Sequence, residues 1–224
     1  MAENMKNQSA PQEVTLNQGE ALFLKYKNVI IACVVVAVVA IAGFMLYKTY
    51  ISTPKELKAS TEMAKAQEYF ANQDFATALN GDSTTVKGFL QIAEEYSSTK
   101  AGNLANLYAG LCYAHIDNWE EAAKFLEKYD AADDQMVSPA AMGALGNVYA
   151  HLNDLDKAVA TLKKAAEKAD NNTLSPTFLI QAGQILESQG KKDEALKLYK
   201  QVKEKYFQSM QYQTIDEYIE RASK

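Results

Sequence analysis

The sequence predicts an all-α protein, with one N-terminal transmembrane helix followed by an α-solenoid of about three to four helix pairs and a C-terminal capping helix. Two features lead to this prediction: an uncharged apolar run from Val29 to Tyr47, and a spacing pattern that recurs three times after residue 100. The composition agrees, since 48% of the 224 residues are hydrophobic and only 4 are Pro and 10 are Gly. Such a composition suits helices better than a turn-rich β fold.

The apolar run is predicted to cross a membrane. Its 19 residues, coiled as a helix, match the roughly 30 Å hydrocarbon core of a bilayer. A buried core helix is the alternative, but few such helices run this long without a polar residue. Lysines flank the run and tyrosines lie at interfacial positions: Lys25, Lys27 and Lys48, with Tyr26, Tyr47 and Tyr50.

The same run does not fit a cleaved leader. A signal peptide has a shorter apolar core and a small-residue cleavage site, and Ile30–Cys33 has too few apolar residues before it for a lipoprotein box. An uncleaved anchor is therefore expected. The positive-inside rule leaves its orientation open, because lysines occur close to both ends of the run.

The chain divides into four predicted segments. These are a disordered tail over residues 1–28, the transmembrane helix over 29–48, a linker with a degenerate first helix pair over 49–102, and repeats with a capping helix over 103–224. Pro54 is expected to end the membrane helix. The degenerate pair is expected to consist of a helix over 56–79, bent at 72–74, and a second helix over 86–96.

Three segments of the last region align without gaps. Each has an Ala twelve residues after a Gly, and a large apolar residue four positions further on: Gly110, Ala122 and Leu126; Gly146, Ala158 and Leu162; Gly183, Ala195 and Tyr199. A mid-helix Gly costs about 1 kcal/mol relative to Ala, so close approach of a neighbouring helix is expected there. Each unit reads as two antiparallel helices that bury their apolar faces against the next unit. Ser138 and Ser175, each followed by Pro, are predicted N-caps.

This arrangement resembles the tetratricopeptide repeat, which has small residues at its eighth and twentieth positions and an aromatic at its eleventh. The resemblance covers roughly residues 103–206 and departs from the pattern at Asn106, where Trp is typical. It implies an inner groove lined by the first helix of each unit. The residues expected to line this groove are Leu104, Leu107, Leu111, Gly143, Asn147, His151, Ile180, Gln184 and Glu187.

The chemistry of this predicted groove favours an extended peptide or a partner helix. Repeats that clamp a carboxylate have Lys and Asn at these positions, whereas Leu107 replaces the Lys here and only Asn147 partly fits. The alternative is that the chain's own terminal helices cover part of the groove.

Several short motifs resemble a narrower family, the ancillary translocon subunits (YfgM-like), in the version found in Bacteroidota. The motifs are Gly88-Phe89-Leu90, Thr99-Lys100-Ala101-Gly102, Ser175-Pro176, Gln181-Ala182-Gly183 and Asp216-Glu217-Tyr218-Ile219. The resemblance implies a bacterial inner-membrane protein with its repeats in the periplasm. Its implied partners are Sec translocon subunits, a membrane-bound chaperone of the prolyl-isomerase type and exported client proteins. It brings no catalytic residues and no cofactor.

Other candidate chemistry is sparse. His115 and His151 share a phase of the repeat but fall on different units without further ligands, so a metal site is not expected. Cys112 is expected to be a small buried side chain that does not pair with Cys33, although a thiol–imidazole pair with His115 is an alternative. Trp119 is expected to pack across its turn, with an exposed partner anchor as the alternative.

The leading hypothesis is therefore a membrane-anchored scaffold at the export machinery. A scaffold or assembly factor for another cell-envelope complex is the first alternative. An enzyme is the second, and it would need clustered perturbed groups in a pocket. Nucleic acid is disfavoured as a partner. The net charge is −5, only Arg221 among the 23 basic residues is an arginine, and no basic cluster occurs.

Overall fold

The computed structural model describes residues 18–82 and 84–224, with side chains from Lys25 onward. It forms two compact units, Met1–Ile51 and Ser52–Lys224. Within the described ranges there is no β-strand, and a single isolated bridge joins Gly81 to Lys87. The all-α prediction is confirmed.

The first unit consists of helix α1 (Gln18–Tyr47) and most of a π-helical segment, Lys48–Ser52. The predicted disordered tail was too long, because α1 begins at Gln18; residues 1–17 of that tail lie outside the described residues. Every side chain from Lys25 to Ile51 is exposed, so a buried core helix does not fit. The described chain has one helical run long and apolar enough to cross a membrane, with a mean hydropathy of 3.1 over its most apolar stretch.

Pro54 does not end a helix, contrary to the prediction. It stands in the first turn of α2 (Thr53–Ala71), directly after the π-helical segment. A proline at the start of a helix costs no hydrogen bond, because the first N–H groups of a helix lack intrahelical partners. The linker expected after residue 49 is therefore helical.

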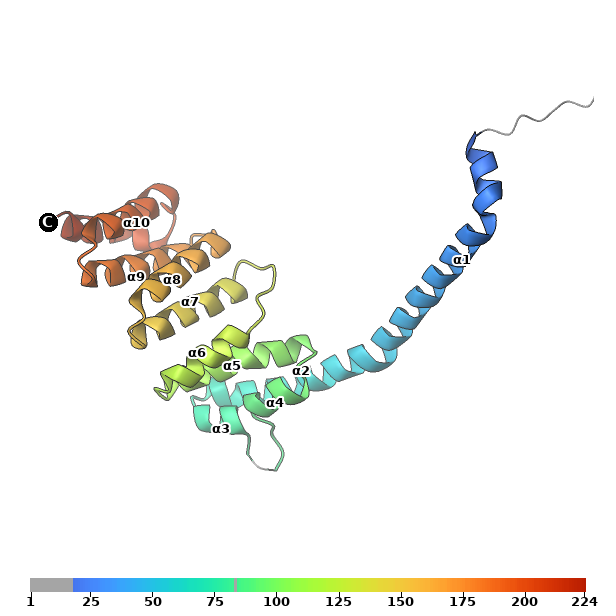
Figure 1. Ribbon diagram of the computed structural model, residues 1–224. Coiled ribbons are helices and arrows are strands. Elements are labelled where there is room, and N and C mark those ends of the chain that lie inside the picture. The colour runs from blue at the N-terminus through green and yellow to red at the C-terminus, as the bar shows by residue number, and fades with distance from the viewer. Residues whose placement is uncertain (1–17, 83) are drawn as a thin grey trace, which may run out of the picture. The chain divides into compact units, whose positions relative to one another are not determined.

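The second unit is a stack of helix pairs (Figure 1). After α2 come α3 (Phe75–Asn80), α4 (Phe89–Glu95), α5 (Lys100–His115), α6 (Trp119–Lys128), α7 (Val137–His151), α8 (Leu155–Ala169), α9 (Ser175–Ser188), α10 (Lys192–Lys205), the 3-10 helix η2 (Met210–Gln213) and α11 (Ile215–Ser223). Figure 1 shows the loops between pairs on one edge of this unit and the turns within pairs on the opposite edge. We call these the loop edge and the turn edge.

One turn geometry joins the two helices of all four pairs. A residue with positive φ follows each first helix: Gln73 (62°), Asp117 (58°), Asn153 (60°) and Gly190 (75°). In each pair the next N–H donates to a carbonyl five residues earlier, at 2.9 Å: Asp74 to Tyr69, Asn118 to Tyr113, Asp154 to Tyr149 and Lys191 to Leu186. Local polar side chains favour this geometry, since Asn and Asp tolerate the left-handed region.

The first pair is α2 with α3, which corrects the predicted pairing of 56–79 with 86–96. Ala66, Tyr69 and Ala78 repeat the spacing of Gly110, Tyr113 and Ala122. The signal was hidden because Tyr69 and Tyr113 are 44 residues apart, whereas Tyr113 and Tyr149 are 36 apart. The eight extra residues match the stretch between α3 and α4, residues 81–88.

Residues 81–88 thus interrupt the second helix of the first pair. With them set aside, Phe89-Leu90 aligns with Phe125-Leu126 of the next pair. Asp82 closes the insertion, since its carboxylate accepts hydrogen bonds from the N–H groups of Thr84, Thr85 and Val86. The Thr85 hydroxyl donates to the same carboxylate and, with these N–H groups, holds the pKa of Asp82 far below its usual range.

The repeated glycines lie where helices cross, as predicted. A Cβ built on Gly110 would stand 2.6 Å from Cγ of Leu126, and one on Gly146 would stand 2.7 Å from Cγ of Leu162. Gly183 meets the ring of Tyr199 in the same way. The alanines that share these crossings are fully buried: Ala122, Ala158 and Ala195.

The predicted N-cap role of Ser138 and Ser175 is wrong. Both serines lie inside the first turn of their helices and are fully buried. The Ser175 hydroxyl donates to the carbonyl of Ala166 and accepts from the N–H of Asn171. Each serine therefore ties its helix to the preceding loop, a tertiary role that looks like a cap in the sequence.

Candidate partner-binding grooves

The nine residues predicted to line a groove do not form one open surface. Leu107, Gly143 and Ile180 are buried, and only His151 and Gln184 are exposed. The remaining four are half-buried: Leu104, Leu111, Asn147 and Glu187. The binding role of the accessible positions stays a prediction, whereas the buried ones belong to the helix packing.

Gly143 shows why a predicted groove position became core. A Cβ at this position would lie 2.2 Å from Cε1 of Phe178. The ring comes from α9, the first helix of the following pair, and it fills the space that the sequence pattern assigned to a ligand. The glycine is thus explained by close packing between adjacent first helices.

Glu187 is covered by the chain's own C-terminal helix. Nε of Arg221, on α11, donates to Oε1 of Glu187 at 3.1 Å. The Tyr199 hydroxyl donates to Oε2 at 2.7 Å. The Arg221 guanidinium lowers the pKa of Glu187, while burial and this carboxylate raise the pKa of Tyr199. The alternative of self-covering by a terminal helix therefore holds for this residue.

Both histidines stack on aromatic rings of the preceding pair. His115 lies parallel to Phe75, with centroids 4.2 Å apart, and His151 lies parallel to Trp119 at 3.7 Å. Each contact joins the end of one first helix to the start of the previous second helix. Trp119 thus packs on the next pair, rather than across its own turn as expected. The described residues contain no group of three or more metal-ligating side chains.

Cys112 is fully buried, as predicted. Burial raises the pKa of its thiol to about 12. Because the thiolate is the nucleophile, such a thiol is unreactive near neutral pH. The geometry therefore gives no support to a thiol–imidazole pair with His115.

A shallow groove of about 280 Å³ opens between the first helices α2 and α5. Its lining residues are Glu56, Ser60, Met63, Gln67, Lys100, Ala101 and Leu104. Leu104 belongs to the predicted set, whereas the α2 residues were missed because the first pair has Ala66 instead of Gly and carries the insertion. The Glu56 carboxylate accepts hydrogen bonds from the N–H groups of Lys100 and Ala101 and so holds α2 against the start of α5.

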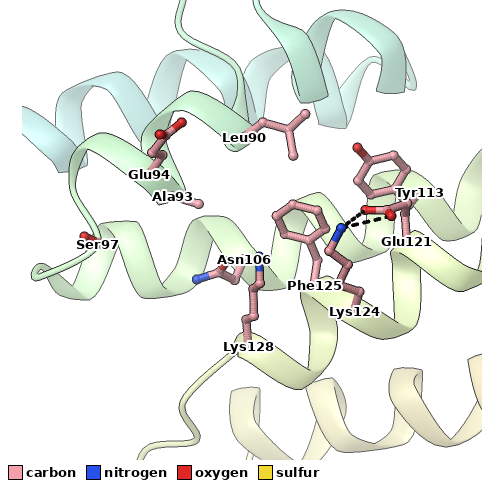
Figure 2. Close-up of a pocket in the computed structure, with 10 residues that line it drawn as sticks. All are labelled: Leu90, Ala93, Glu94, Ser97, Asn106, Tyr113, Glu121, Lys124, Phe125 and Lys128. Atoms are coloured by element: carbon pink, nitrogen blue, oxygen red, sulfur yellow. Dashed lines mark hydrogen bonds and ion pairs between the residues drawn. The ribbon is translucent and has the colours of Figure 1, made fainter.

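A larger groove of about 610 Å³ lies on the opposite layer, between the second helices α4 and α6 and over α5 (Figure 2). Its lining residues are Leu90, Ala93, Glu94, Ser97, Asn106, Tyr113, Glu121, Lys124, Phe125 and Lys128. Figure 2 shows the Phe125 ring between Leu90 and Lys128, with Lys124 paired to Glu121 on the same helix. Lys128 lies over the Phe125 ring, 4.5 Å from its centroid.

The groove is open because charge pairing differs from one pair of helices to the next. Between α6 and α8, Glu127 pairs with Lys157 at 3.6 Å and accepts from the Tyr149 hydroxyl at 2.6 Å. The residues aligned with this ion pair one step earlier are Gln91 and Glu121, which cannot form one. Among the described residues no ion pair joins α4 to α6.

The whole chain can now be compared with known proteins. The sequence profile described as a tetratricopeptide repeat-like domain matches residues 21–216. The chain belongs to the tetratricopeptide repeat-like family. No curated protein matches it.

Solved structures share the tetratricopeptide-like fold at low sequence identity. Two crystal structures of a Podosopora anserina protein, described as a kinesin light chain with nearly identical TPR-like repeats, are 14% identical with a TM-score of 0.57. They cover 77% of this chain and 87% of their own. The crystal structure of the MamA protein is 15% identical with a TM-score of 0.54, covering 73% of this chain and 89% of its own. At these identities the likeness concerns the fold alone.

Tetratricopeptide-type repeats serve as scaffolds for protein–protein interaction, and this sets the frame for the two grooves. The repeat-like domain offers one accessible strip on its first helices and one hollow on its second helices. Both combine apolar floors with amide and charged rims, which is the composition that orients a bound peptide or helix.

Proposed function

We propose that this protein is a membrane-anchored tetratricopeptide scaffold that works at the Sec translocon of a bacterial inner membrane, with its repeats in the periplasm. In this proposal it holds a periplasmic chaperone of the prolyl-isomerase type, and exported clients, close to the translocon. The observation that carries the proposal is the combination in one chain of an exposed apolar helix and a tetratricopeptide-like solenoid. The placement beside the translocon rests on the motif resemblance to ancillary translocon subunits.

Anchoring supports such a role energetically. A tether confines the repeats to a thin layer at the membrane, which raises the effective concentration of any partner in the same membrane. A shallow groove of about 280 Å³ can then work at weak intrinsic affinity. Weak, tethered binding also allows a client to leave quickly, because most affinity differences lie in the dissociation rate.

The binding strip that we propose runs over accessible residues of the first helices. Gln67 on α2, Asn147 on α7 and Gln184 on α9 are half-buried or exposed, and Leu104 lines the groove beside Gln67. Amide side chains can bond to the backbone of an extended segment, and the neighbouring apolar positions can take its side chains.

Photo-crosslinking in intact cells tests the proposal. A photoreactive amino acid is placed singly at Gln67, Asn147 and Gln184, with the exposed α8 residue Lys163 as the matched control. We expect adducts with translocon subunits, a chaperone or exported proteins from the first three positions and none from the control.

The outcomes separate the candidate functions. Adducts confined to another envelope complex would favour the assembly-factor function, and adducts from Lys163 alone would place the binding face on the second helices. A tagged chain that co-purifies from mild detergent with neither a translocon subunit nor a chaperone would reject the proposed location. Protease accessibility of the repeats in spheroplasts checks the periplasmic orientation independently.

A further inference from the structure

Exposed large apolar side chains are unevenly distributed over the second unit. Among the described residues of Ser52–Lys224, seven are exposed: Leu57, Ile116, Met136, Val137, Phe207, Met210 and Tyr212. Six lie where first helices begin or second helices have ended, which is the loop edge. Ile116 alone lies on the turn edge, directly after α5.

The C-terminal part of this edge is the most apolar. Phe207 is 60% exposed and Met210 is 85% exposed, in the short connection between α10 and α11. Met136 and Val137 stand at the start of α7, and Leu57 at the start of α2. These positions recur along the stack instead of forming one hydrophobic pocket, so they mark a line of contact with an extended surface.

Lysines accompany the apolar residues on the same edge. The last turns of the second helices contain Lys128 on α6, Lys168 on α8 and both Lys203 and Lys205 on α10. Carboxylates also occur there, including Asp133 and Asp134, so the edge is not strongly basic. Apolar and aromatic side chains mixed with lysines are typical of the bilayer interface, where lysine stems lie along apolar surface while their ammonium groups stay hydrated.

Chain connectivity identifies the surface that this edge meets. The chain enters the second unit at the start of α2, on the loop edge, directly after the helical run that is apolar enough to cross a membrane. The other first helices also begin at this edge (Figure 1). We infer that the loop edge lies against the membrane surface, with Phe207, Met210 and Tyr212 inserted into the headgroup region of the bilayer. The inference rests on the proposed membrane anchoring and adds the orientation of the scaffold.

This orientation has a consequence for the grooves. With the loop edge on the bilayer, the helices of each pair stand away from the membrane and the turn edge is farthest from it. Both the first-helix and the second-helix layers then remain accessible from the side. A partner embedded in the same membrane can reach them without detaching the edge.

Fluorescence quenching in nanodiscs tests the inference with the full chain. In a Cys33→Ala background, Met210→Cys and, separately, Ile116→Cys are labelled with a bimane fluorophore; the remaining Cys112 is buried. Ile116 is the matched control, since it is an exposed apolar residue on the turn edge. The nanodiscs are phosphatidylcholine, with or without a lipid that carries a quenching nitroxide close to the headgroup.

We expect the label at position 210 to lose most of its fluorescence in the nitroxide discs and the label at position 116 to lose little. Replacing Phe207 and Tyr212 by Ser should restore fluorescence at position 210, with an unchanged helical circular dichroism spectrum. A chain that stays in the discs with neither label quenched, or with both quenched equally, would overturn the inference and leave the anchor intact. Quenching at 210 that is absent in discs, combined with protection of the label in native membranes, would assign the edge to a protein partner. A chain that does not remain in the discs would overturn the anchoring itself.

Discussion

Gly110 and Gly146 are held against the second helix of their pair at distances that leave no room for a methyl group. Helix propensity alone favours Ala at both positions by about 1 kcal/mol, so the packing term must be the larger one. The contact is with Cγ of a leucine, an atom close to the backbone that cannot easily move aside. These glycines therefore report the helix–helix distance.

Gly110→Ala should destabilise the repeats by about 1–2 kcal/mol, the usual cost of overpacking less the gain in helix propensity. The Cβ would also approach the backbone N of Leu126 to 3.0 Å, so α6 itself must shift. Urea denaturation followed by circular dichroism measures the change. In a Leu126→Ala background the same substitution should cost less, because the leucine side chain is gone. An unchanged or higher midpoint for Gly110→Ala alone would show that the crossing is loose.

Trp119 is the single tryptophan of the chain, and its stack on His151 makes it a reporter of the contact between two pairs. Protonated imidazole quenches indole fluorescence, and a cation over an indole face is also attracted to it. We therefore expect the emission of Trp119 to fall as the pH is lowered through the range in which histidine titrates. His151→Gln should remove this step. His115→Gln, on the Phe75 stack, is the matched control and should leave it in place.

At the scale of elements, short local motifs start and stop most helices. Asp74, Asn118 and Asp154 each accept a hydrogen bond from the N–H three residues later, at the start of α3, α6 and α8. Such caps typically contribute about 1 kcal/mol each. Lys191 at the fourth turn has no side-chain cap, and Gly190 supplies the positive φ there.

Deleting residues 81–88 should leave a folded protein with a continuous second helix in the first pair. The deletion restores the 36-residue spacing between Tyr69 and Tyr113, and it brings Phe89-Leu90 into the register of Phe125-Leu126. Circular dichroism should show retained helicity and one cooperative thermal transition. A collapse of helicity would mean that the insertion closed by Asp82 is needed to set the direction of α4. Deleting residues 101–108 removes the same length from inside α5 and should unfold the pair.

The C-terminal helix α11 should detach in acid before the rest of the solenoid unfolds. Its ion pair depends on ionised Glu187, whose pKa in the folded protein lies below the ordinary 4.5 because of Arg221. A depressed carboxyl pKa gives stability that is present at neutral pH and is lost as the pH falls through the folded-state value. The loss should be about 1 kcal/mol, since Arg221 is half-exposed and screened by water.

Hydrogen exchange of α11 amides against pH measures this detachment. Arg221→Gln should show fast α11 exchange already at neutral pH and little further change in acid. The pair of Lys203 with Asp216 also holds α11. If Arg221→Gln and the unmodified chain exchange alike at neutral pH, that second pair rather than Arg221 holds the helix.

At the scale of the whole molecule, the described chain consists of two compact units with opposite surface chemistry. From Lys25 to Ile51 every side chain is exposed and most are apolar, whereas the repeats bury three successive apolar clusters. In water the first unit would expose a large apolar surface without a partner. A lipid environment removes that cost, because it takes the place of water around those side chains.

Membrane fractionation tests the anchor. The full chain should stay in the pellet after alkaline carbonate extraction, and deletion of residues 29–47 should release it to the soluble fraction. A control with eight alanines of this segment and its neighbours replaced by leucine should remain in the pellet. Release of the full chain by carbonate would contradict membrane spanning.

Much of this protein was determined by local pattern. The apolar run, the three glycine–alanine spacings and the polar turns depend on periodicity and backbone preference, and the sequence displays both directly. From them the helical class, the membrane segment and the antiparallel pairs followed. Asn118 as a cap and Cys112 as a buried thiol could also be predicted, because each depends on immediate neighbours.

The tertiary structure decided which of these residues remain accessible. Gly143 is closed by Phe178 from another helix, Glu187 is covered by Arg221 from the C-terminal helix, and Ser138 and Ser175 bond to loops instead of capping helices. These contacts join residues whose pairing has no local period, so no spacing rule predicts them. The first pair escaped prediction for the same reason: an insertion changes sequence distance without changing the fold, and only packing shows that the helices on either side belong to one repeat.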